Sequence, residues 1–203
     1  MQNNQTITDL AMQRRGRKVF LLMLTFFVVP IIVVVLMFKF NWKPGGVSTG
    51  ELVKPARLLQ TQEMLKNDEG TPLKATFWKE KWSIVYVTDQ CEKTCQAKLR
   101  DMRQLHVSLY KDITRTQRVL ITQQQETKDI KSKFPDLIVI NQPADEVALL
   151  SKQFQIDNEV VQNSERLYLV DPLGHLMMSY KPTVPLADVR KDVTRLLRYS
   201  WAG

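Results

Sequence analysis

The sequence lacks several motifs that usually reveal an enzyme's chemistry. Its seven glycines form no glycine-rich phosphate loop, and no serine lies in a Gly-x-Ser-x-Gly setting. Spacing alone singles out no pair of carboxylates, and there is no internal repeat or low-complexity tract. Cysteine and histidine are scarce, with two residues of each. Any chemistry of this chain must therefore come from few residues.

The chain also lacks a basic stripe, although its net charge is +8. Lysine and arginine are interleaved with aspartate and glutamate over most of the 203 residues, so we expect no nucleic-acid partner. The length, with 25% charged and 44% hydrophobic residues, fits one globular domain plus an attachment. One basic cluster does stand out, formed by Arg14, Arg15, Arg17 and Lys18. It directly precedes a long apolar run.

That run predicts a transmembrane helix over residues 19–38. Every residue in it is apolar except Thr25, and at about 1.5 Å per residue it spans the roughly 30 Å hydrocarbon layer of a lipid bilayer. No small-residue cleavage site follows, so we expect an uncleaved anchor. The positive-inside rule keeps residues 1–18 in the cytoplasm and exports the rest. Without an Arg- and Ser-rich transit peptide, the expected location is a bacterial inner membrane, with the C-terminal domain in the periplasm.

The exported part predicts an α/β domain. Residues 39–57 are expected to be a linker because glycine and proline are frequent there, and residues 58–203 to be the domain. The expected strands cover residues 82–87, 118–122, 136–140, 167–170 and 175–180, and the expected helices cover residues 92–112, 144–154 and 185–199. Residues 171–174 form the turn of a hairpin. This alternation predicts a mixed sheet covered by helices.

The two cysteines, Cys91 and Cys95, lie where the expected strand 82–87 is followed by the expected helix 92–112. In an oxidising compartment the pair could form a structural bridge, a redox couple or a metal site. A disulfide needs Cβ atoms about 3.5 to 4.5 Å apart, so Cys91 must precede the first full helical turn if a bridge forms. A bridge that closes so short a loop stabilises the fold little. Thiol chemistry or metal binding therefore explains the pair better than stapling.

These features together resemble the Sco (SenC) family of membrane-anchored, thioredoxin-like proteins. The similarity rests on Cys91-x-x-x-Cys95 opening a helix and on the hairpin Tyr168-Leu-Val-Asp-Pro-Leu-Gly174, and it covers approximately residues 50–199. It implies a thioredoxin-like fold and a role at the binuclear copper site of cytochrome c oxidase, through copper delivery or thiol reduction. The implied partners are an oxidase subunit or a copper chaperone.

The resemblance also implies a copper site made of two cysteines and a histidine, with copper as the possible cofactor. The place of that histidine is taken by Asn163, followed by Ser164, and an amide is a poor copper ligand beside imidazole or thiolate. His106, expected on the inward face of the long helix, and His175, expected beyond the hairpin turn, are weak substitutes. Cys91 and Cys95 are thus the candidate catalytic residues and the candidate copper ligands.

Three functions follow from this sequence. The leading hypothesis is a Sco-like protein, a possible thiol-disulfide oxidoreductase, that assists assembly of the oxidase copper site through Cys91 and Cys95. The second is a copper metallochaperone that completes its site with a ligand from another group or protein. The third is a non-catalytic binding module in which the cysteine pair is vestigial or only locks a loop.

Overall fold

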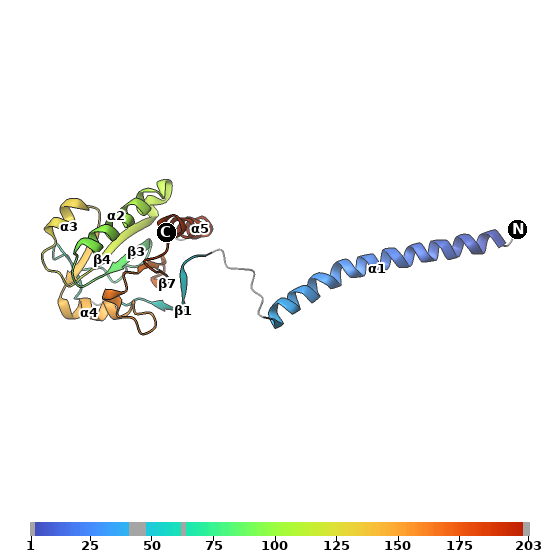
Figure 1. Cartoon of the computed structure of the whole chain (residues 1–203), viewed down its shortest axis with the longest axis horizontal. Helices are drawn as coiled ribbons and strands as arrows, with labels where there is room; N and C mark the ends of the chain where they lie inside the picture. Colours follow the sequence, from blue (N-terminus) through green and yellow to red (C-terminus); the bar gives the residue numbers. More distant parts are fainter. Residues whose placement is uncertain (1–2, 41–47, 62–63, 201–203) are drawn as a thin grey trace. The chain divides into compact units, whose positions relative to one another are not determined.

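The computed structural model describes residues 3–40, 48–61 and 64–200 and contains two compact units, residues 1–47 and 48–203 (Figure 1). The first unit contains α1 (Asn3–Lys39), which continues through Pro30. Its segment Gly16–Lys39 is, among the described residues, the one helix long and apolar enough to cross a membrane, and it includes the predicted span. Its apolar side chains are exposed, as expected for contact with lipid. Part of the predicted linker, residues 41–47, lies outside the described residues.

The second unit is built on a mixed sheet, which contains seven strands within the described residues. The order is β1 (Glu51–Leu58), β7 (His175–Tyr180), β6 (Leu167–Val170), β3 (Trp82–Val87), β4 (Thr116–Ile121), β5 (Ile138–Gln142) and β2 (Lys66–Asn67). Strands β3, β4 and β5 are parallel, whereas the remaining pairs are antiparallel. The predicted α/β class with a mixed sheet is confirmed.

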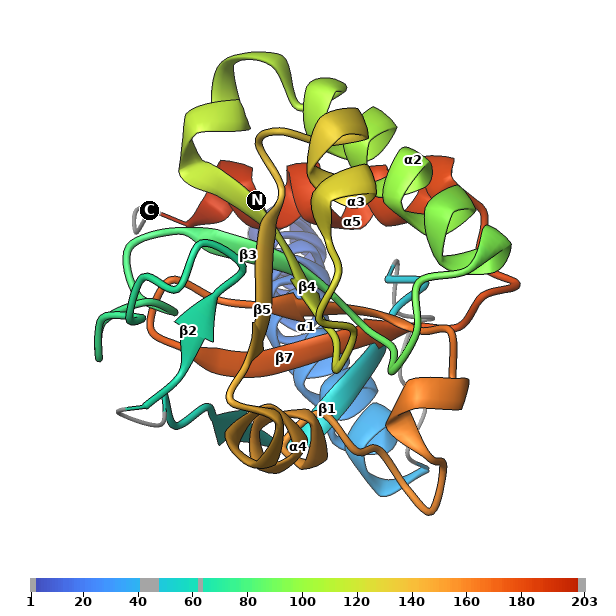
Figure 2. The same cartoon turned by 90° about the vertical axis from the view of Figure 1, so that its left-hand side faces the viewer.

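Helices cover both faces of this sheet, as Figure 2 shows. One face packs against α2 (Lys93–Val107), α3 (Lys128–Lys133) and α5 (Leu186–Tyr199), and the other against α4 (Ala144–Lys152). All six residues of β3 are buried, with Ile84 and Tyr86 toward the first face and Val85 and Val87 toward the second. Residues 82–87, which are mostly β-branched or aromatic, therefore mark the central strand, because both of its faces are covered.

The long predicted helix over residues 92–112 is wrong at its C-terminal end. Helix α2 stops at Val107, and a 3-10 helix, η1 (Tyr110–Arg115), follows it. Ser108 caps the end by donating its hydroxyl to the carbonyl of Leu105 (2.7 Å), and Tyr110 has a φ of 50°, which an α-helix cannot accommodate. The predicted strands over 118–122 and 136–140 are each displaced by two residues at their starts.

The folded unit begins before residue 58, where the sequence placed the end of the linker. Strand β1 runs from Glu51 to Leu58 and pairs with β7, although it contains Pro55. Strand β1 lies at the edge of the sheet, so it pairs with β7 on one side alone. Its register shifts between Leu52 and Arg57, and an edge strand with such an irregularity tolerates a proline, which has no amide hydrogen to donate. The composition of this segment resembles a loop, but its pairing with a distant strand makes it part of the sheet.

Candidate functional site

Chain topology brings three segments to the same end of the sheet. Strand β3 ends at Val87, shortly before Cys91, and it pairs antiparallel with β6 so that Tyr86 faces Leu167. The segment that leads into β6 therefore lies beside the cysteines. Strand β7 in turn pairs Tyr180 with Leu167, which places the residues after β7 at this end too. Side chains that follow or precede strands at such an edge are free to form a site.

The cysteines form a disulfide that joins the loop after β3 to the first turn of α2. Cys91 precedes the helix, Cys95 is its third residue, and their Cα atoms are 4.9 Å apart. This is the arrangement that bridge geometry required, because two residues inside the regular helix would be too far apart. Both residues are nearly buried, with 8% of Cys91 and 3% of Cys95 exposed, and both belong to the apolar core under α2.

The loop that carries Cys91 is held by the neighbouring loop after β4. The backbone amide of Cys91 donates to Oε1 of Gln124 (2.8 Å), and the hydroxyl of Thr122 donates to the carbonyl of Asp89 (3.0 Å). The amide of Asn141 donates to the carbonyl of Gln124 (3.1 Å), which fixes this second loop. Gln124 is not predictable as a site residue from the sequence, because its contact spans 33 positions and no motif marks it.

A polar pocket of about 260 Å³ opens beside the disulfide. Its lining includes Cys95 from α2, Glu92 at the start of that helix, and Asn163 and Glu165 from the segment before β6. Cys91 does not line it. Asn163, predicted to stand in the place of the family's histidine, therefore lies in the same pocket as Cys95.

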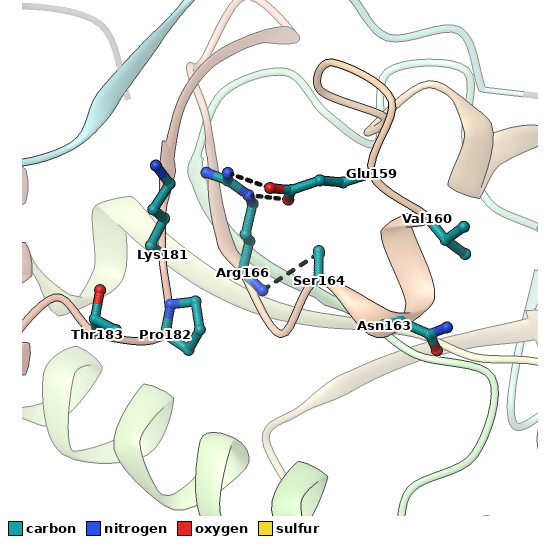
Figure 3. Close-up of a pocket in the computed structure, with 8 residues that line it drawn as sticks. All are labelled: Glu159, Val160, Asn163, Ser164, Arg166, Lys181, Pro182 and Thr183. Carbon is teal, nitrogen blue, oxygen red and sulfur yellow. Dashed lines mark hydrogen bonds and ion pairs between the residues drawn. The ribbon is translucent and has the colours of Figure 1, made fainter.

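A second pocket, of about 510 Å³, adjoins the first, since Asn163 lines both (Figure 3). Beneath it lies Arg166, which is 2% exposed. Its guanidinium donates two bonds to Glu159, at 2.8 and 3.1 Å, and one bond of 2.6 Å to Glu51. Lys181 also contacts Glu51, at 2.7 Å. Hydrogen bonds from these cations lower the pKa of both carboxyls, with Lys181 the larger influence on Glu51.

The ion pairs of Arg166 with Glu51 and Glu159 join β1 to the loop before β6 at the disulfide end of the sheet. A charge so deeply buried needs such partners, since an unpaired guanidinium would be strongly destabilising. Arg166 is likewise not predictable from the sequence, because its partner Glu51 is 115 positions away and lies in the segment predicted to be a linker.

Neither histidine lies at the disulfide. His106 sits on α2, and its Nε2 is 3.2 Å from the carbonyl oxygens of both Ile113 and Thr116, so the tautomer protonated at Nε2 fits. Burial lowers the pKa of His106. His175 begins β7 at the opposite end of the sheet, where its Nδ1 lies 3.2 Å from Asp171. Both contacts are structural in character.

The donors around the disulfide do not form a complete copper site. The two sulfurs are bonded to each other, and Asn163 offers an amide, which is a poor copper ligand. Within the described part of the chain, no group of three or more His, Cys, Asp or Glu residues is placed to hold a metal ion. Reduction would free two thiolates, which suit copper, but copper sites in proteins generally use further ligands.

The fold is similar to that of solved Sco proteins. Yeast Sco1 with copper bound is 18% identical, with a TM-score of 0.58, 77% of this chain and 96% of that chain covered. BsSco, described as a Sco-family cytochrome c oxidase assembly protein with a disulfide switch, is 16% identical, with a TM-score of 0.52 and coverages of 73% and 99%. A thiol:disulfide interchange protein of the thioredoxin family from Chlorobium tepidum is 18% identical, with a TM-score of 0.52 and coverages of 70% and 98%.

At these identities the similarity establishes the fold, which is thioredoxin-like, and it confirms the predicted resemblance to Sco at that level. No curated protein matches the sequence significantly. A family model named transmembrane-like, thioredoxin-like, C-terminal domain matches residues 82–200, from the first residue of β3 to the residue after α5. The chain therefore belongs to the transmembrane-like, thioredoxin-like C-terminal domain family.

Proposed function

We propose that this protein is a membrane-anchored, Sco-like thiol-disulfide oxidoreductase that acts through Cys91 and Cys95. The observation that carries the proposal is the disulfide at the C-terminal end of β3, beside a polar pocket. A bridge across four positions restricts the unfolded chain less than a bridge between distant segments would. Stabilisation of the fold therefore explains the disulfide poorly, and thiol-disulfide exchange explains it better. The alternative of a binding module leaves this placement unexplained.

The reaction is an exchange of two electrons between the pair and a thiol partner. A partner thiolate attacks one sulfur of the bridge, the other sulfur leaves as a thiolate and takes a proton, and a mixed disulfide forms. A second partner thiol then attacks the mixed disulfide, which yields the reduced pair and an oxidised partner. In the reverse direction the reduced pair reduces a disulfide of the client.

The proposed client is the pair of copper-binding cysteines of a cytochrome c oxidase subunit, or a copper chaperone. The Sco-family structures of the same fold support this choice. The proposed location is a bacterial inner membrane, with residues 1–18 in the cytoplasm and the thioredoxin-like domain in the periplasm, since four basic residues precede the apolar segment. A C-terminal reporter that is active only in the cytoplasm should be silent, and activity of that reporter would reject the topology.

The redox role is tested by titrating the full-length chain, in detergent, against glutathione buffers of known potential. We expect a reversible two-electron transition, which mass spectrometry after alkylation measures. We also expect the reduced pair to transfer electrons to the oxidised copper-binding domain of an oxidase subunit. A bridge that stays oxidised until the domain unfolds would reject the role. Reversible titration without transfer to this domain would reject the client and keep the chemistry.

Copper delivery is the second candidate, and here copper is cargo. Asn163 lies in the pocket that Cys95 lines, at the place where Sco-like proteins supply a histidine. In this function the reduced cysteines supply two thiolates and the receiving protein supplies the missing ligand, so that the isolated chain binds copper weakly. Tight copper binding by the reduced, isolated chain would contradict that division of ligands.

A further inference from the structure

The pocket beside the disulfide carries charge of one sign, in contrast to the whole chain. Glu92 and Glu165 are its charged lining residues, and its lining contains no lysine, arginine or histidine. Residues 48–203 contain 23 lysines and arginines against 20 aspartates and glutamates, a net charge of +3, so the overall charge of the domain does not account for this acidic surface. The charge at the disulfide is therefore a local property, set by two residues from different segments.

In the described residues neither carboxylate forms an ion pair, although Lys93 directly follows Glu92 and is exposed. No ion pair involves Glu92 or Glu165, and Glu92 makes no side-chain cap to α2. The nearest arginine along the chain, Arg166, is already bound by Glu159 and Glu51 under the adjoining pocket. Its positive charge is consequently balanced there and does not offset Glu165.

The backbone at Glu165 has an unusual conformation. Its φ of 50° lies in the left-handed region, which residues other than glycine seldom adopt, and it immediately precedes the buried Arg166 and β6. Such conformations persist where the surrounding structure imposes them, often at functional sites. The side chain also lies close enough to Tyr86, another lining residue, to add to the rise of its pKa to about 12, which burial chiefly causes.

We propose that Glu92 and Glu165 select thiol partners that carry a positive charge next to the reacting sulfur. A thiolate that enters this pocket brings a negative charge toward two carboxylates, and an adjacent ammonium or guanidinium group offsets that repulsion. The preferred partner is a cysteine flanked by lysine or arginine, and anionic thiols are disfavoured. The inference rests on the proposed thiol-disulfide function and names its substrate class.

The test uses three small thiols of similar size on the oxidised, full-length chain in a neutral detergent. Cysteamine is cationic, mercaptoethanol is neutral and 3-mercaptopropionate is anionic. The rate of bridge reduction by each is divided by the rate of the same thiol with hydroxyethyl disulfide, which removes differences in intrinsic nucleophilicity. We expect the corrected rates to fall from cation to neutral thiol to anion, spanning about tenfold at low ionic strength and contracting in 1 M salt.

The double variant Glu92→Gln, Glu165→Gln should reduce this span to about twofold or less, while each single variant removes part of it. Glu69→Gln is the matched control, since Glu69 is exposed and lines none of the three pockets described for this chain. Equal corrected rates in the wild type would overturn the inference and leave the redox function intact, as would a full span in the double variant. If none of the thiols reduces the folded protein, the proposed function fails and the inference fails with it.

Discussion

Polar side chains lie at both ends of the central sheet, but those at the disulfide end line an open pocket, whereas those at the other end hold a turn together. At the end that carries His175, the turn uses them internally. Asp171 accepts the backbone amides of Leu173 and His175, and the carbonyl of Gly174 accepts the amide of Leu59. At the disulfide end, side chains from three segments surround an open pocket. A histidine at a satisfied turn thus offers less chemistry than two cysteines beside an open polar pocket.

The largest expected effect comes from placing an imidazole at the disulfide end. Asn163→His adds a nitrogen ligand to the pocket that Cys95 lines, so the reduced variant should bind cuprous copper roughly tenfold or more tightly than wild type. Equilibrium competition with a copper chelator measures this change. Gln155→His, which adds an imidazole at an exposed position that lines neither pocket of this end, is the control and should bind as wild type does. Equally tight binding by wild type and Asn163→His would show that another residue already completes the site.

A second comparison removes one hydrogen-bonding side chain from each end. Gln124→Ala deletes the acceptor for the Cys91 amide, and Asp171→Ala deletes the acceptor for two amides of the opposite turn. Each should lower the free energy of unfolding by about 1 kcal/mol or somewhat more. Only Gln124→Ala should also make the bridge easier to reduce, raising its potential by up to about 30 mV.

Urea unfolding and redox titration of both variants measure these two quantities. Asp171→Ala serves as the control for a general loss of stability. A shift of potential in Asp171→Ala as large as that in Gln124→Ala would mean that the two ends are energetically linked, and that the contact to Cys91 has no special role.

Local sequence signals predicted the centre of the molecule better than its edges. The apolar residues 82–87 and the cysteines after them identified the central strand and the disulfide end, because a strand buried on both faces leaves a continuous apolar run. Strand β1 was predicted as a linker because Gly50 and Pro55 break regular structure, whereas its pairing with β7 is a tertiary contact. Gln124 and Arg166 were missed for the same reason, since their partners are remote in sequence.

The reactivity of the two thiols provides a finer test of the disulfide end. In the reduced protein we expect Cys91 to react first with limiting iodoacetamide, by roughly threefold, because it directly precedes the N-terminal end of α2, where the helix dipole favours a thiolate. It is also slightly more exposed than Cys95. Peptide mapping by mass spectrometry gives the order. Faster labelling of Cys95 would reverse the roles assigned to the two thiols.

The smallest expected effect concerns acid stability, and it again involves the disulfide end. Hydrogen bonds from Lys181 and Arg166 lower the pKa of Glu51, and those from Arg166 lower that of Glu159, below the unfolded value of about 4.3. The stability from these carboxylates is therefore fully present above that value and is lost as pH falls through the folded-state pKa. Because both carboxylates are about half exposed, solvent screening keeps the contribution small.

Arg166→Met should consequently show a shallower loss of unfolding free energy between pH 7 and about pH 3 than wild type. Glu159 then loses its cationic partner and Glu51 keeps only Lys181, so the folded-state pKa values of the two carboxyls move back toward the unfolded value. Urea unfolding at several pH values measures the slope. Lys131→Met is the matched control. Lys131 bonds the carbonyls of Pro135 and Leu137, so this substitution removes one positive charge without removing a partner of a carboxylate. If Lys131→Met flattened the slope as much as Arg166→Met, net charge would explain the effect, and the paired carboxylates at the disulfide end would not.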